Sequence, residues 1–125
     1  MAIAGPKYET YLESAARTAT PTKVDKTVPK GVRGMRVTID ATAVTATPSL
    51  TCTIQAKDAV SGKYSTLLAS TAIATISTTT LLVYPDATAA ANLVANLPVG
   101  SIVAIDCVHG DADSITYSVA IDWLV

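Results

Sequence analysis

A histidine and two aspartates lie close together near the carboxyl end of the chain, where His109 is followed by Asp111 and Asp113. An imidazole beside two carboxylates offers the chemistry of a metal site or of a general base. The stretch lacks the further acidic ligands and the closing glutamate of a calcium loop. A run of this composition is also an ordinary connection between two strands. The sequence therefore favours a turn at residues 109–113, and no bound metal or cofactor is expected.

The other reactive side chains form no recognisable catalytic motif. Cys52 and Cys107 show neither CxxC nor Cys/His spacing. This favours two small buried hydrophobic residues, with a disulfide between strands as the alternative. The many serines and threonines include no GxSxG elbow, no phosphate-binding loop and no GxGxxG run. We therefore predict that the chain is not an enzyme.

The elements that would position these residues are strands, because residues 34–123 show the two-residue period of half-buried β-structure. In the last strand, Tyr117 and Trp123 share a face with three aliphatic residues and are expected in the core. The expected strands are residues 35–42, 50–57, 63–70, 79–84, 102–108 and 115–123, with a hairpin joining the second and third. Residues 87–97 are expected to form a loop with at most one or two helical turns. The pattern predicts an all-β fold, an antiparallel β-sandwich of jelly-roll or immunoglobulin-like type.

The first 33 residues follow a different pattern. Two glycines and three prolines interrupt them, and proline removes a backbone donor and disfavours helix in the residue before it. We expect an extended N-terminal arm over residues 1–33, outside the core and ordered on binding, with at most a short helical turn at Tyr11–Arg17. A β-sandwich domain over residues 34–125 is expected to follow.

Charge divides near the same boundary. Residues 1–36 hold seven basic and three acidic side chains, a balance of +4, whereas residues 37–125 hold two basic and seven acidic ones, a balance of −5. Such polarity suits docking onto another copy of the chain or onto an acidic surface. The candidate partner-binding residues are those of the arm: Lys7, Tyr8, Tyr11, Arg17, Lys23, Lys26, Lys30 and Arg33.

Nucleic acid and membrane are not expected as partners. The basic residues are scattered and few aromatic residues lie near them, unlike a nucleic-acid-binding surface. No segment approaches the ~18 apolar residues that span a bilayer. The first residues lack the basic and apolar regions of a secretory signal.

Several stretches between Ile39 and Val119 resemble a family of small virion structural proteins of tailed bacteriophages. The matching stretches are TAVTATPSLT (42–51), KDAVSGKY (57–64), LLAS (67–70), TTTLLVYP (78–85), Asn92, Leu97-Pro98 and HGDADSITYSV (109–119). The resemblance implies a decoration or cement protein on the capsid exterior, made in the host cytoplasm. It implies that the chain binds the major capsid protein as a homo-oligomer, with a trimer favoured. It transfers no catalytic site, and the arm lies largely outside it.

Two other classes fit the same observations. One is a different virion component, in the tail tube, the connector or a fibre base. The other is a carbohydrate- or host-surface-binding module, which commonly relies on exposed aromatic side chains. The five tyrosines and one tryptophan are mostly assigned to strands, which disfavours this second class.

Overall fold

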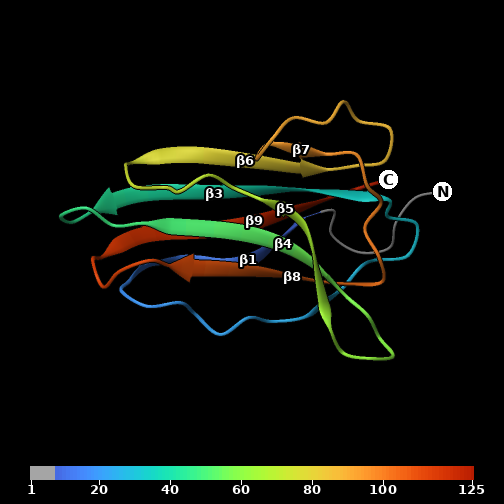
Figure 1. Ribbon diagram of the computed structural model, residues 1–125, viewed down its shortest axis with the longest axis horizontal. Coiled ribbons are helices and arrows are strands. Elements are labelled where there is room, and N and C mark those ends of the chain that lie inside the picture. Colours follow the sequence, from blue (N-terminus) through green and yellow to red (C-terminus); the bar gives the residue numbers. More distant parts are fainter. Residues whose placement is uncertain (1–7) are drawn as a thin grey trace.

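The computed structural model describes residues 8–125, which form two β-sheets packed against each other (Figure 1). The five-stranded sheet has the order β1-β9-β3-β6-β7, and the four-stranded sheet has the order β2-β8-β4-β5. The strands are β1 (Tyr8–Arg17), β2 (Lys26–Thr27), β3 (Gly34–Val44), β4 (Leu50–Lys57), β5 (Tyr64–Ala69), β6 (Ser77–Val83), β7 (Val94–Ala95), β8 (Ile102–His109) and β9 (Ile115–Leu124). No helix occurs within residues 8–125, so the predicted all-β sandwich is confirmed at this level.

Six strands lie where the alternation of apolar and polar residues predicted them. β4 and β5 form the expected antiparallel hairpin. β9 pairs with β3 from Leu124, opposite Gly34, to Ile115, opposite Val44. Tyr117 and Trp123 are buried in the core as predicted, with 0% and 4% exposure.

β1 corrects the expectation that residues 1–33 lie outside the core. It pairs antiparallel with β9, from Tyr8 opposite Asp122 to Arg17 opposite Ile115, so Tyr11–Arg17 is strand and not a helical turn. Tyr11 is itself buried in the core. The described part of this segment is extended, as expected, but belongs to the sandwich. The physical reason is that β9 would otherwise present an unpaired edge, and pairing satisfies the backbone groups of both strands.

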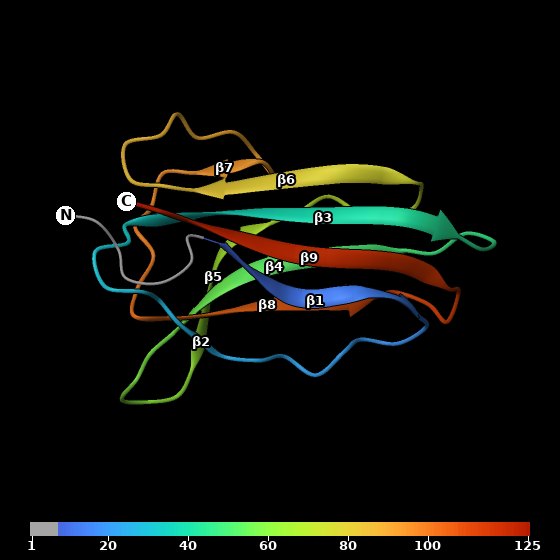
Figure 2. The same ribbon diagram turned by 180° about the vertical axis from the view of Figure 1, so that it is seen from behind.

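The remaining corrections concern two very short strands. Residues 18–25 leave β1 and lead to β2, which pairs with β8 at Ile102 and Val103. Figure 2 shows this segment running alongside β1 and β8. The expected loop over residues 87–97 contains β7, which pairs in parallel with Leu82 and Val83 of β6. Two-residue strands carry too little sequence for a period to be recognised.

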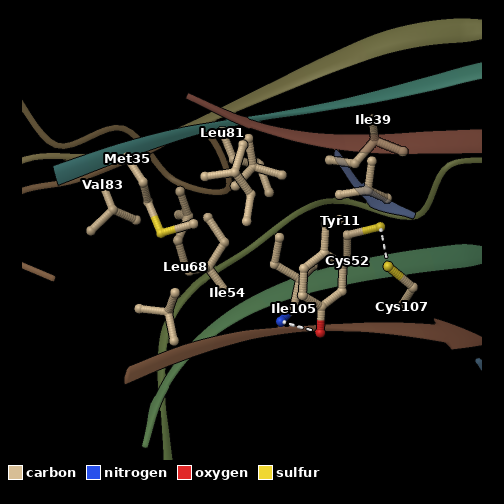
Figure 3. Close-up of a cluster of buried hydrophobic side chains, with 14 of the residues drawn as sticks. Tyr11, Met35, Ile39, Cys52, Ile54, Leu68, Leu81, Val83, Ile105 and Cys107 are labelled. Atoms are coloured by element: carbon tan, nitrogen blue, oxygen red, sulfur yellow. Dashed lines mark hydrogen bonds between the residues drawn. The ribbon is translucent and has the colours of Figure 1, made fainter. Parts of the chain in front are cut away.

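The core lies between the sheets and is built mainly from aliphatic side chains. In Figure 3, Met35, Ile39 and Leu81 of the five-stranded sheet lie opposite Ile54 and Ile105 of the four-stranded sheet. All five are at most 1% exposed. Burying each such side chain contributes roughly 1.5–3 kcal/mol. The inward face of each strand therefore holds the two sheets together and leaves the outer faces for other contacts.

Candidate functional site

Tyr11, a predicted partner-binding residue, instead joins the two sheets. Its hydroxyl donates a hydrogen bond to the Val24 carbonyl oxygen at 2.7 Å and accepts one from the Val24 N–H at 2.8 Å. It also accepts a bond from the N–H of Ile105 in β8 at 3.2 Å (Figure 3). Burial raises the pKa of the Tyr11 hydroxyl, which stays neutral and can both donate and accept. Tyr11 thus fastens β1 and residues 18–25 to the edge of β8.

Lys23 lies against the outer face of the four-stranded sheet. Its Nζ donates a hydrogen bond to Oε1 of Gln55 at 2.8 Å and lies 3.5 Å from the ring centroid of Tyr64. Asp25 accepts hydrogen bonds from Nζ of Lys57 at 2.6 Å and from the Tyr64 hydroxyl at 2.5 Å. The bond from Lys57, followed by that from Tyr64, lowers the pKa of Asp25. This cluster holds the N-terminal segment onto the sheet. It pairs Asp25, an acidic residue of the segment, with Lys57, a basic residue of the β-sandwich domain.

Arg17, the last residue of β1, packs against Tyr117 of β9. Its guanidinium donates to the Tyr117 carbonyl oxygen at 2.8 Å and to that of Glu13 at 2.7 Å, and its Cζ lies 4.7 Å from the Tyr117 ring centroid. The Tyr117 hydroxyl lies 3.0 Å from Nε2 of His109. Burial, followed by the positive charge of Arg17, lowers the pKa of His109. Arg17, Tyr117 and His109 therefore form one cluster of side chains that contact each other.

The other predicted partner-binding residues are dispersed. Tyr8 is 69% exposed at the start of β1, Lys26 is partly buried in β2, and Lys30 and Arg33 are exposed before β3. Lys7 lies outside the described residues. Tyr8 and Arg17 lie at opposite ends of β1 in one sheet, whereas Lys26 lies in β2 of the other. The described members of the predicted set are therefore spread over both sheets.

The turn after β8 is occupied with internal contacts. The Asp113 carboxylate accepts a hydrogen bond from the Thr47 N–H at 3.2 Å, and the His109 N–H donates to the Thr20 hydroxyl at 2.9 Å. Asp111 accepts a bond from the Asp113 N–H at 3.1 Å. In the part of the chain that the structure describes, no three His, Cys, Asp or Glu side chains are grouped to hold a metal, and no pocket is found. These contacts stabilise the connection between β8 and β9.

The outer face of the five-stranded sheet is a surface that the sequence analysis missed. Cross-strand pairing places Thr10, Ala120, Thr38 and Thr80 in one row across β1, β9, β3 and β6. The pairing of β9, β3 and β6 places Ser118, Asp40 and Thr78 in the next row. In Figure 2 these strands lie side by side with no other described segment in front of them. We call Thr10, Thr38, Asp40, Thr78, Thr80, Ser118 and Ala120 the threonine face; its one charged group, the Asp40 carboxylate, accepts a hydrogen bond from the Thr78 hydroxyl at 3.2 Å.

A signal for the threonine face was present in the sequence. Small polar residues alternate with core residues along β3, β6 and β9, but only the pairing of the strands shows that they form rows. An ion pair between Arg36 and Asp122, 3.0 Å apart, borders the face. Since most of its side chains are short and uncharged, the face is suited to contact a broad surface rather than to bind a small ligand.

Comparison with known proteins adds no relative, because no protein-family model, no curated protein and no solved structure matches this chain. A search of the described residues finds no helix long and apolar enough to cross a membrane. The surface of the sandwich and the resemblance in its strands and turns are therefore the basis for a functional proposal.

Proposed function

We propose that this chain is a virion structural protein of a tailed bacteriophage, a decoration protein on the capsid exterior. In this proposal it binds the major capsid protein as a homo-oligomer, with a trimer favoured, and stabilises the shell without enzymatic activity. Nucleic acid and membrane are not partners. We also propose that the β-sandwich is of jelly-roll or immunoglobulin-like type.

The threonine face is the observation that carries this proposal. Alanine loses no rotamer freedom on burial, and short side chains lose less than the long ones of lysine and arginine. A four-strand-wide surface of such side chains can therefore be covered by a partner at a small entropic cost. The basic N-terminal segment, which charge alone suggested as the anchor, is held on its own sheets by Tyr11 and by the Asp25–Lys57 pair. We therefore assign docking to the threonine face.

An oligomer fits this mode of docking. A stable protein interface buries about 1,200–2,000 Å² in total, or about 800 Å² on each partner. Linking several weak contacts through one oligomer multiplies the effective affinity without any new contact. The proposal thus requires both self-association and a face that docks on the shell.

The proposal is tested by mixing purified protein with undecorated capsids of its phage. Ala120→Arg places a long charged side chain in the four-strand row of the threonine face, where Ala120 pairs with Thr38 and is exposed. We expect at least a tenfold loss of capsid binding, since burying an unpaired charge costs more than 1.4 kcal/mol. Thr66→Arg is the matched control, because Thr66 is exposed on β5 of the other sheet.

Binding is measured by co-sedimentation, and folding of both variants by their thermal unfolding midpoints. Equal loss of binding in both variants, or full binding by folded Ala120→Arg, contradicts docking through the threonine face. Failure of the unmodified protein to bind capsids, together with recovery in a tail fraction, favours the other virion component. Binding to a glycan array in place of capsids favours the carbohydrate-binding module.

A further inference from the structure

The two cysteines lie directly opposite each other in the four-stranded sheet. Cys52 is in β4 and Cys107 in β8, and the two residues are cross-strand partners. Their Sγ atoms are 3.6 Å apart, with both side chains pointing into the space between the sheets (Figure 3). Cys52 is 0% and Cys107 1% exposed. The chain thus places two thiols in contact although they are 55 positions apart in the sequence.

The backbone of this pair has the register that a cross-strand bond requires. The Cys52 carbonyl oxygen accepts a bond from the Ser70 N–H, and the Cys52 N–H donates to the Ser70 hydroxyl. The hydrogen-bonding groups of Cys52 therefore point away from β8, and Cys52 and Cys107 form a non-hydrogen-bonded pair. Cα atoms in such pairs are about 4.5 Å apart, within the range of about 4.4–6.8 Å that disulfides span. Closing the bond needs side-chain rotation and no change of strand register.

We propose that Cys52 and Cys107 are an oxidation site that closes into an intrachain disulfide between β4 and β8. With glutathione disulfide as the oxidant, the thiolate of one cysteine attacks it, forming a mixed disulfide and releasing one glutathione thiolate. The thiolate of the other cysteine then attacks the protein sulfur and releases the second glutathione. The two protein thiols lose two protons and two electrons, and the oxidant becomes two glutathione thiols.

The fold makes the reaction slow in the closed sandwich. The hydrogen bond to Cys107, followed by burial, raises the pKa of the Cys52 thiol, so little reactive thiolate is present. β2 covers the outer edge of β8 only at Ile102 and Val103. By the alternation of the ladder, the N–H of Cys107 faces the same edge as those of Ile105 and His109, which is held by the hydroxyls of Tyr11 and Thr20 and not by a strand ladder. Local opening along this edge is therefore the route by which the oxidant reaches the thiols.

The experiment uses the full chain, reduced and then incubated with glutathione disulfide in urea below the unfolding midpoint. Protein thiols are counted in strong denaturant, the intact mass is measured, and a non-reducing peptide map identifies the linked residues. We expect both thiols to disappear, with the loss of two hydrogen atoms, no retained glutathione and one Cys52–Cys107 peptide. The thermal midpoint should rise on the order of 10 °C and fall back on reduction, because the bond closes a long loop in the unfolded chain.

Two variants separate the proposal from a structural role of the thiols. Cys52→Val/Cys107→Val keeps an apolar pair, and its midpoint should not respond to the oxidant. Cys107→Ala should retain one glutathione as a stable mixed disulfide, since the second displacement has no thiol. The proposal is overturned if the unmodified chain keeps both thiols, retains two glutathiones, or forms only interchain dimers. An oxidised protein whose midpoint does not exceed that of the reduced protein also overturns it.

Discussion

Replacing Tyr11 with Phe removes one hydroxyl from the junction between β1, residues 18–25 and β8. The ring remains, so the core keeps its packing, but three hydrogen bonds are lost. The N–H of Ile105 lies in the core and loses its partner, at about 1–3 kcal/mol. Val24 is 46% exposed as a residue, so its peptide groups can bind water instead and each bond there is worth about 0.5–1.5 kcal/mol. We expect Tyr11→Phe to lower the free energy of unfolding by about 2–6 kcal/mol.

Urea unfolding, followed by tryptophan fluorescence from Trp123, measures this loss. The midpoint should fall while the slope m stays unchanged, because the variant exposes the same surface on unfolding. Tyr8→Phe is the control, because Tyr8 is 69% exposed and its substitution should change stability by less than about 0.5 kcal/mol. A Tyr11→Phe variant as stable as the control refutes the reasoning, since residues 8–33 would then behave as an arm that leaves the core unchanged.

Two further predictions concern the close contact at Gly34 and the titration of His109. Gly34→Ala places a Cβ atom 2.5 Å from the Val83 carbonyl oxygen, and this overpacking should lower the free energy of unfolding in urea by about 1–3 kcal/mol. Gly100→Ala is the control and should cost far less, because nothing lies within 4 Å of its added Cβ. Equal losses of stability in the two variants contradict the close contact at Gly34. The pKa of His109 is lowered from 6.5, so the unfolded chain binds its proton more readily. Its contribution to stability is therefore complete above pH 6.5 and is lost as pH falls below that value towards the lowered folded pKa. The thermal midpoint of the unmodified protein should fall as the pH is lowered from about 7.5 to 5.5, and that of His109→Gln should fall less steeply. If the midpoints of both proteins fall equally with pH, His109 is not the group responsible.

The strands that the sequence predicted are those with one face wholly in the core. β9 alternates without interruption because its inward side chains are buried and its outward ones are not. β4 is similarly regular, and Pro48 marks the turn before it. In such strands the burial of one face sets the sequence pattern directly, so a two-residue period is a reliable guide.

β1 escaped prediction because its pairing is irregular. Its register with β9 shifts between Thr10 and Leu12 and again between Leu12 and Ala15. The four residues 13–16 are all exposed, so the sequence there shows no alternation. Local signals from proline and charge favoured an excluded arm, and the long-range pairing with β9 overrode them. Tyr11, an aromatic residue in a mainly polar stretch, was the remaining sign of a buried anchor.

The candidate site escaped prediction for a related reason. A row such as Thr10–Ala120–Thr38–Thr80 draws one residue from each of four strands, so its members are adjacent only after the sheet has formed. The basic residues, by contrast, are close in sequence but separate in the fold. Two of the basic residues that charge along the chain indicated for docking, Arg17 and Lys23, instead make contacts within the sandwich.

The edges of the two sheets give a further reason to assign docking to a face. An uncovered strand edge invites pairing with another chain, and proteins limit this by bulges, charges and covering groups. β1 carries two register shifts together with Glu9 and Glu13. On β8, the hydroxyls of Tyr11 and Thr20 accept hydrogen bonds from the outward N–H groups of Ile105 and His109. Strand addition at these two edges is therefore disfavoured, whereas the threonine face between β1 and β6 presents mostly short side chains with Asp40 as its one charged group.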